Sequence, residues 1–461
     1  MTSVSSTTLH GLDPLRRIFG GEIHAPGDPG YESERKAWNL SVEQRPALIA
    51  VPRTADDVAR LVRWARSRGL RVAPQATGHN AAPMRGLERT VLLRTGRMRR
   101  VELDVPGRRA RAEAGAFVTE VLDPASGHGL GILSGSSPNV SLVGYALGGG
   151  IGFVGRRHGL CANTVTAIEA VLADGTQVRC DRDEHPDLFW ALRGGGGNFA
   201  IVTAIELELV PMPELSGGGL MWPWERAQEI LNAWADWTRS APESATTTAM
   251  LLQVPPLPDI PEPLRGRRFV RVDGAILAGE AEAREILAPL LALGPELDMF
   301  TACEPAFLSR LHMDPEDPTP MRSGNALLED VTPQAVDDLL SVAGPGSRSP
   351  LAIVEMRHFG GAAGRVPEGA GALGRVPAEY GLFTAGRVME PSLSGQVDGA
   401  VDRVLDAPRS VRSGSVYLNL SERPADVAAS VDDETFTRLR AVKAAYDPDD
   451  LIQANHPIAP A

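Results

Sequence analysis

The first strongly patterned region, residues 46–74, has apolar and polar positions that predict a strand, a helix and a second strand. An apolar run at 47–51 has the length of a strand. Thr54 is a good N-cap for the helix that follows, and Gly69 is a good terminator. Between them, apolar residues recur at helical spacing, at Val58, Leu61, Val62 and Ala65. A strand at 70–73 completes a β-α-β unit, which implies parallel strands and a right-handed crossover.

The next apolar segments are short and are separated by turn residues. Three of them form a predicted strand meander, at 91–93, 101–103 and 110–112. Residues 164–180 form a predicted hairpin, because Asp174-Gly175 suits a two-residue turn with positive backbone φ. A further long strand is predicted at 199–210.

From Pro211 onward the pattern of the sequence changes, which indicates a second domain. Residues 216–219 and 255–263 are irregular and rich in Pro or Gly, as expected at the entrance and rim of another domain. Helical and strand patterns then alternate. Helices are predicted at 225–237, 280–293 and 333–342, and strands at 269–275 and 351–356.

The composition is that of an ordinary soluble protein. Of the 461 residues, 43% are hydrophobic and 23% are charged, which suits two domains with a large shared core. The net charge of -12 argues against nucleic-acid or anionic-membrane binding. No segment approaches the roughly 20 apolar residues that span a bilayer. The Ser/Thr-rich start, Met1 to His10, lacks a secretory pattern and is predicted to be a short disordered arm.

The cysteine and histidine content excludes two other classes of protein. The three cysteines, Cys161, Cys180 and Cys303, are far apart, which fits a reducing, cytoplasmic location and argues against disulfides. None of the nine histidines belongs to an H-E-x-x-H pair, so a zinc hydrolase is not expected. We therefore expect no metal site.

Three glycine-rich loops carry the candidate chemistry, at 74–80, 135–160 and 186–202. Backbone N–H groups in such loops can cradle a pyrophosphate, and missing side chains let a cofactor approach closely. None of the loops is a Rossmann G-x-G-x-x-G motif that opens a helix, and no Walker G-K-[ST] occurs.

Taken together and in order, these loops resemble the berberine bridge enzyme-like branch of the flavin oxidases related to vanillyl-alcohol oxidase. The resemblance covers 45–210 well, 416–460 moderately and the middle of the chain weakly. QATGH at 75–79 stands where the family has Arg-Gly-Gly-Gly-His. SSPNV and GGGIG match the central loop, PDLFWALRGGGGNF is close to the family consensus, and AYDPDDLIQANHPIAP resembles its closing segment.

The resemblance implies an FAD cofactor that is covalently bonded to His79. Members with two covalent flavin bonds carry Cys where this chain has Ser137, and serine is too weak a nucleophile to replace it. We therefore expect a single link. Cys161 is an alternative second anchor, but it is expected to pack as a small hydrophobe. An N-linked imidazole raises the flavin reduction potential and prevents loss of the cofactor.

The resemblance also implies which other residues contact FAD, including polar residues near the C-terminus. Tyr145 has an alternative role as a packing residue under the flavin loop. The expected contacts, besides His79, are Gln75, Ala76, Thr77, Gly78, Asn80, Gly135, Ser136, Ser137, Val140, Gly144, Tyr145, Gly149, Gly150, Ile201, Val202, Asn455 and His456.

The implied reaction is hydride removal from a small organic substrate, with the flavin reoxidised by O₂ to give H₂O₂. Sugar-oxidising relatives place tyrosines as bases where this chain has Ile151 and Leu420. The chain is therefore more similar to the hydroxynicotine oxidase and polyketide-tailoring branch. The remaining candidates for proton handling are Tyr417, Glu355 and His358.

Glu355 is the preferred candidate. Period-two alternation puts Glu355, Arg357 and Phe359 on one face of a strand, and Met356 and His358 on the other. Only one set faces the cavity. If it is the first, partial desolvation should raise the pKa of Glu355. The alternative is a Glu355–Arg357 pair on a solvated face.

The sequence therefore predicts a two-lobed α+β oxidase. We expect an FAD lobe from 1–212 and 411–461, and a substrate lobe from 213–410 with an antiparallel sheet backed by helices. The expected partners are O₂ and a small secondary metabolite or alkaloid-like substrate, and the expected assembly is a monomer or homodimer. The alternatives are a dehydrogenase with another electron acceptor and a non-catalytic flavin- or ligand-binding protein.

Overall fold

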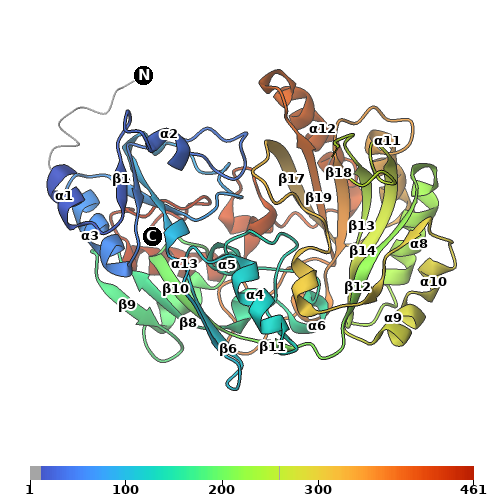
Figure 1. Ribbon diagram of the computed structural model, residues 1–461, viewed down its shortest axis with the longest axis horizontal. Coiled ribbons are helices and arrows are strands. Elements are labelled where there is room, and N and C mark those ends of the chain that lie inside the picture. The colour runs from blue at the N-terminus through green and yellow to red at the C-terminus, as the bar shows by residue number, and fades with distance from the viewer. Residues whose placement is uncertain (1–11, 259) are drawn as a thin grey trace.

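The chain folds into two lobes that lie side by side (Figure 1). The computed structural model describes residues 12–258 and 260–461. The arm predicted for Met1 to His10 lies outside these residues. Helices and mainly antiparallel sheets occur in both lobes, so the predicted two-lobed α+β fold is confirmed.

The first lobe begins with a small sheet that confirms the predicted strand, helix and strand. β2 and β3 both pair in parallel with β4, and α3 (Ala55–Arg66) connects β2 to β3. The Thr54 side chain caps α3 by accepting a hydrogen bond from the backbone N–H of Asp57. In spatial order the strands are β1 (Glu22–His24), β2 (Leu48–Val51), β4 (Thr90–Arg94) and β3 (Arg71–Gln75).

The predicted meander is wrong at its first segment. β4 lies between β2 and β3, whereas the other two segments form an antiparallel pair in a different sheet. Burial explains the difference. Val91, Leu92 and Leu93 are all 0% exposed, as is typical of a parallel strand covered on both faces.

The second sheet of this lobe is antiparallel and contains the predicted hairpin and long strand. In spatial order its strands are β5 (Val101–Asp104), β6 (Arg109–Glu113), β10 (Ile201–Glu208), β8 (Val165–Val171) and β9 (Gln177–Cys180). The turn from β8 to β9 differs from the two-residue prediction. The Leu172 N–H donates to the Thr176 carbonyl, and of the two expected residues Gly175 alone has positive φ. Asp174 instead accepts a hydrogen bond from the Thr176 N–H.

The second lobe contains an eight-stranded antiparallel sheet. In spatial order its strands are β15 (Leu297–Asp298), β12 (Ser216–Pro223), β14 (Arg268–Ile276), β13 (Ala245–Gln253), β18 (Ile353–His358), β19 (Tyr380–Arg387) and β17 (Met321–Leu328), and β16 (Thr301–Ala302) also pairs with β12. Helices pack on the face that is turned away from the first lobe (Figure 1). They are α8 (Ala227–Thr238), α9 (Glu280–Ile286), α10 (Ala288–Leu291), α11 (Pro333–Ala343) and α12 (Ser394–Asp406).

The remaining elements connect and close the first lobe. A two-stranded ladder pairs β7 (Leu130–Gly131) with β11 (Val210–Pro211). The helices are α1 (Leu12–Ile18), α2 (Tyr31–Glu34), α4 (Val118–Ser126), α5 (Leu142–Leu147), α6 (Gly155–His158), α7 (Pro186–Leu192) and α13 (Asp433–Tyr446). In the part of the chain that the structure describes, no helix has the length and apolar character needed to cross a bilayer.

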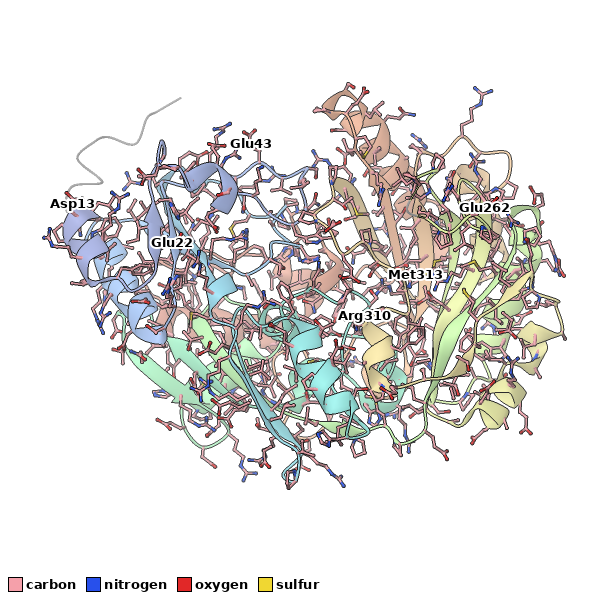
Figure 2. All side chains as sticks on the ribbon, viewed as in Figure 1. Asp13, Glu22, Glu43, Glu262, Arg310 and Met313 are labelled. Atoms are coloured by element: carbon pink, nitrogen blue, oxygen red, sulfur yellow. The ribbon has the colours of Figure 1, made fainter. Side chains whose placement is uncertain are left out.

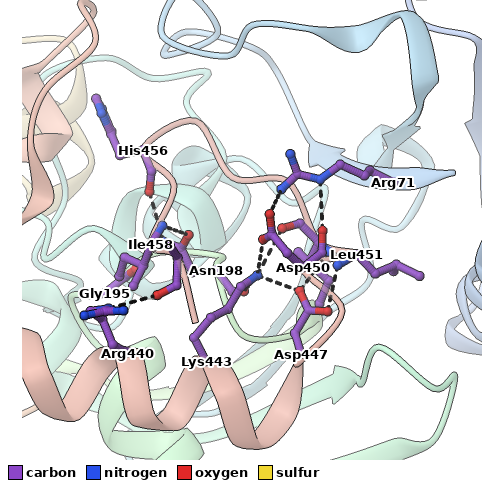
Figure 3. Close-up of polar contacts among 12 residues, drawn as sticks. Arg71, Gly195, Asn198, Arg440, Lys443, Asp447, Asp450, Leu451, His456 and Ile458 are labelled. Carbon is purple, nitrogen blue, oxygen red and sulfur yellow. Dashed lines mark hydrogen bonds and ion pairs between the residues drawn. The ribbon is translucent and has the colours of Figure 1, made fainter. Parts of the chain in front are cut away.

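The C-terminal segment is fastened to the first lobe by a buried lysine. The Lys443 ammonium is 0% exposed, donates to the Asn198 carbonyl at 2.9 Å and pairs with Asp447 at 2.6 Å (Figure 3). Ile452 bridges Val72 of β3 in parallel. A buried charge requires such partners, so these contacts fix where the chain end lies.

The structure does not define the domain boundaries sharply. β12 of the second lobe begins at Ser216, close to the predicted change at 212. Within 411–461, Arg412 bridges Leu328 of the second lobe, although Ile452 lies in the first. The boundaries 1–212, 213–410 and 411–461 stay a prediction.

Candidate active site

A cavity of about 750 Å³ lies between the two lobes. This volume is in the range of cofactor and substrate pockets. One wall comes from the three glycine-rich loops, and the other comes from the eight-stranded sheet. The C-terminal segment and the chain around Met313 also contribute, and Figure 2 shows Met313 in the region between the lobes.

The first loop holds His79 in a defined environment after β3. The indole of Trp38 stacks on the imidazole with ring centroids 4.2 Å apart, and Thr77 Oγ1 lies 2.8 Å from His79 Nδ1. His79 Nε2 has no hydrogen-bond partner among the described residues. Burial lowers the pKa of His79 to about 3. At neutral pH the imidazole is therefore uncharged and keeps a lone pair on one nitrogen.

The second loop wraps around Tyr145. A Cβ at Gly150, where φ is +73°, would lie 2.6 Å from the Tyr145 ring, and a Cβ at Gly135 would lie 3.1 Å from it. The Tyr145 hydroxyl has no hydrogen-bond partner in the described part of the chain, and burial raises its pKa. Tyr145 therefore packs under the loop and also lines the cavity, which combines the two predicted roles.

The two residues weighed as a second flavin anchor lie in different places. Ser137 lines the cavity, and its hydroxyl donates to Asn139 Oδ1 at 3.2 Å. Cys161 is 0% exposed and lies in the apolar core of the first lobe, outside the cavity lining. Burial raises the pKa of the Cys161 thiol to about 12, which makes it a poor nucleophile at neutral pH.

Most of the predicted cofactor residues line the cavity, but three do not. Gly149 and Gly150 lie behind the lining, where their positive φ values let the chain turn. Ile201 does not line the cavity, because its side chain is buried in the core while its neighbours Ala200 and Val202 face the cavity. The predicted residues that do line it are Gln75, Ala76, Thr77, Gly78, His79, Asn80, Gly135, Ser136, Ser137, Val140, Gly144, Tyr145, Val202, Asn455 and His456.

The cavity wall on the second lobe carries a chain of buried charged side chains. Glu355 on β18 bonds His312 through one carboxylate oxygen at 2.8 Å and Arg357 through the other at 2.6 Å. The other imidazole nitrogen of His312 lies 2.9 Å from Asp273, which also pairs with Arg271 at 3.1 Å. Glu355 and Arg357 face the cavity, as the alternation of the strand allows.

These neighbours reverse the pKa shift predicted for Glu355. Burial would raise its pKa, but the Arg357 guanidinium and the His312 imidazolium lower it to about 2. For His312, burial is outweighed by the carboxylates of Asp273 and Glu355, which raise its pKa to about 10. The prediction of a raised pKa is wrong because both partners of Glu355 are cations. At neutral pH the carboxylate is ionised, and its low pKa makes it a weak proton acceptor.

His358 is also wrong as a candidate for proton handling. Its side chain points to the other face of β18, where Nε2 lies 2.7 Å from Arg156 Nη1 and the ring stacks on Tyr380. His358 does not line the cavity. Burial lowers its pKa to about 3.

Tyr417 lies beside the central loop, where a Cβ at Gly149 would lie 3.3 Å from its hydroxyl. Its side chain is 1% exposed and lines the cavity, as do Ile151 and Leu420. Burial raises the pKa of Tyr417, so its hydroxyl stays protonated at neutral pH. The Tyr417 hydroxyl forms no hydrogen bond with any described residue.

Several cavity residues were not among the sequence candidates. The run 194–198 lines the cavity, and its glycines were the available signal. His312 and Asp314 belong to no local sequence motif. The long connection between β16 and β17 brings them to the wall. Glu422 lines the cavity, accepts a hydrogen bond from Asn39 at 3.1 Å and has its pKa raised by burial to about 7.

The residues present fit an FAD cofactor. Gly144 and Gly197 both line the cavity, and an added Cβ at either would meet no atom within 4 Å. Side chains there would fill space that the glycines leave open. The neutral imidazole of His79 adds a group with an unpartnered nitrogen at the same wall. Open backbone next to a neutral imidazole leaves room for a bound flavin at this wall.

Comparisons with known proteins agree with this assignment. The FAD binding domain family matches residues 46–181. The chain is 29% identical over 467 residues to (R)-6-hydroxynicotine oxidase of Paenarthrobacter nicotinovorans, covering 95% of this chain and 97% of that protein. The fold is similar to that of the Physcomitrella patens BBE-like 1 protein, with a TM-score of 0.83, 18% identity and coverage of 97% and 98%. It is also similar to Acremonium strictum glucooligosaccharide oxidase, which has a 6-S-cysteinyl, 8α-N1-histidyl FAD, with a TM-score of 0.79, 21% identity and coverage of 97% and 98%.

The cavity and its glycine-rich wall thus define an FAD-linked oxidoreductase. Within that class, the chain carries an FAD binding domain at residues 46–181 and is similar over nearly its whole length to hydroxynicotine oxidase, and its fold is similar to that of berberine bridge enzyme-like proteins.

Proposed function

We propose that the chain holds FAD through a single covalent bond to His79 and oxidises a small organic substrate. Bound FAD would accept a hydride, and O₂ would take the two electrons to give H₂O₂. The observation that carries this proposal is the half-buried imidazole of His79, which is uncharged and faces a glycine-walled cavity. A neutral imidazole has the lone pair that a bond to carbon requires.

The number of covalent bonds follows from the side chains at the other candidate position. Ser137 occupies the cavity where doubly linked relatives have cysteine, and its hydroxyl is a weak nucleophile. Cys161 lies outside the cavity and is protonated at neutral pH. These observations support one link and distinguish this chain from the glucooligosaccharide oxidase, whose flavin has two.

The chain's own residues would position the substrate over the cofactor. Glu355 stays ionised and orients Arg357 and His312, so its proposed role is positioning and not proton abstraction. Tyr417 keeps its proton and is free to donate a hydrogen bond to a substrate oxygen or nitrogen.

Removal of a proton from an alcohol or amine substrate requires a base with a pKa near the working pH. Glu422 is the proposed acceptor, because its carboxyl lines the cavity and has a pKa of about 7. We further propose a cytoplasmic monomer or homodimer that acts on a secondary metabolite or alkaloid-like compound.

The direct test is purification of the full chain followed by acid precipitation. A yellow pellet with a colourless supernatant supports covalent FAD, and a yellow supernatant contradicts it. Substrate candidates are then mixed with the holoprotein in air. H₂O₂ formed in proportion to oxidised product supports an oxidase, whereas flavin reduction that persists in air indicates a dehydrogenase.

A further inference from the structure

Arg357 is a cavity arginine that is only partly satisfied by the protein. Its Nε donates to Glu355 Oε1 at 2.6 Å, and its guanidinium carbon lies 5.9 Å from the Phe383 ring centroid. Its two terminal nitrogens form no hydrogen bond with any described residue. The side chain is 17% exposed, and it lines the cavity. Two N–H-bearing nitrogens are therefore available to a ligand.

The partner of Arg357 is itself shared with another cation. Glu355 divides its charge between Arg357 and His312, and Asp273 divides its charge between His312 and Arg271. Three cations thus face two carboxylates along this chain of contacts. His312 already compensates part of the negative charge of Glu355, so the Arg357 guanidinium can still attract an anion.

Two further charged groups belong to the same wall. Asp314 lines the cavity, but its carboxylate accepts a hydrogen bond from Ser136 across the lobes at 2.7 Å. Arg387 lines the cavity and forms no ion pair with the described residues. When both are counted, four cations face three carboxylates on this wall, so the charge around Arg357 favours an anion over an ammonium group.

The rest of this wall is apolar. Apolar side chains line the cavity near β18, the strand of Arg357. They are Met250 and Leu252 on β13, Val254 and Leu257 in the segment after β13, and Phe383 on β19. An aromatic or aliphatic body is favoured against such a surface. The combination of an apolar wall with the open guanidinium of Arg357, which Glu355 holds in place, describes a ligand with an apolar body and one acid group.

We propose that Arg357 binds the carboxylate of the substrate, which makes the enzyme selective for apolar small molecules that carry an ionised acid group. This inference rests on the proposed function, since it names the substrate class of the same cavity. A guanidinium presents parallel N–H donors that match a carboxylate, and Glu355 fixes the guanidinium through the remaining nitrogen. A cationic amine of the same size would be repelled, so this inference selects an acidic secondary metabolite over an alkaloid-like amine among the proposed substrates.

The test compares three unreactive ligands of one shape and different charge: benzoate, neutral benzamide and cationic benzylammonium. Each is titrated into the holoprotein at pH 7, and the change in the visible flavin spectrum gives a dissociation constant. Charge-assisted hydrogen bonds contribute about 1.5–3 kcal/mol, so benzoate should bind at least about 10-fold more tightly than benzamide. Preference for benzylammonium, or equal binding of all three, would overturn the proposal.

Variants then test whether Arg357 is the residue that causes the preference for benzoate. Arg357→Gln should remove the preference for benzoate over benzamide, and Arg357→Lys should retain part of it. Arg365→Gln is the matched control, because Arg365 pairs with Glu243 at an exposed site on the same lobe and should leave the preference unchanged. A benzoate preference that survives in folded Arg357→Gln would contradict the proposal, whether or not the substitution alters the flavin spectrum.

Failure of the proposed function is distinguishable from failure of this inference. A protein that purifies without flavin would contradict the function before any titration. Calorimetric titration of that protein with the same three ligands would still decide whether Arg357 selects carboxylates.

Discussion

The two walls of the cavity differ in how their residues reach the site. The wall on the first lobe is made of consecutive residues in three loops, such as 75–80, and much of it is backbone. The wall on the second lobe is made of side chains from strands that are far apart in sequence, such as Arg271 on β14 and Glu355 on β18. The first wall can be recognised from sequence, whereas the chemistry of the second depends on strand pairing.

The largest expected effect tests the loop wall. His79→Ala should abolish covalent attachment, because the remaining candidate nucleophiles are a hydroxyl at Ser137 and a buried thiol at Cys161. Absorbance of the acid supernatant measures the released FAD. Cys161→Ala is the matched control and should keep the flavin in the pellet. Flavin retained in the pellet of His79→Ala would require another anchor.

The second prediction tests the sheet wall. Glu355→Gln should slow flavin reduction by about 10²-fold through misplacement of Arg357, since small displacements of positioning groups have effects of that size. The loss should be the same from pH 6 to 9, because the pKa of Glu355 is held near 2. Rapid-mixing measurement of flavin reduction checks this. A loss that changes with pH in step with a titrating carboxyl would restore Glu355 as the base.

The third prediction returns to the loop wall and concerns its backbone. Gly150→Ala combines positive φ with a Cβ 2.6 Å from the Tyr145 ring, and should destabilise the fold by about 3 kcal/mol. Gly86→Ala shares the positive φ of +69° but meets no atom within 4 Å, so it should cost only about 1 kcal/mol. Denaturant unfolding of both variants measures the difference. Equal losses would show that crowding around Tyr145 contributes nothing.

The last prediction concerns the pH dependence of the free energy of unfolding and tests the sheet wall. The folded-state pKa of His312 is raised from 6.5 to about 10. A raised pKa means that the stabilisation is fully present below pH 6.5 and is lost as pH rises toward 10. Wild type should therefore lose stability relative to His312→Gln over that window. Parallel curves from pH 7 to 10 would show that the imidazolium is not held between the two carboxylates.

The sequence predicts the parts of the molecule that depend on local patterns. The helix after Thr54, the hairpin around Gly175 and the position of His79 all follow from neighbouring residues. β4 was placed in the wrong sheet because its apolar run looks the same in a parallel or an antiparallel setting.

The errors at Glu355 and His358 have a different cause. Alternation along a strand predicts which residues share a face, but it does not predict which cations of other segments lie against that face. Arg357 on the same strand face and His312 from a connection without a strand pattern together reverse the pKa shift of Glu355. Glu422 was missed because its surroundings come from distant parts of the chain, such as Asn39, which donates a hydrogen bond to it and is nearly 400 residues away.

The most direct test of the central claim is peptide mass mapping of the purified full chain under conditions that preserve flavin bonds. The account predicts one flavin-bearing peptide, the one that contains His79, with the added mass of FAD on the histidine. It also predicts that peptides containing Ser137 and Cys161 have their unmodified masses. An unmodified His79 peptide in a yellow protein, or a flavin on any other residue, would contradict the account.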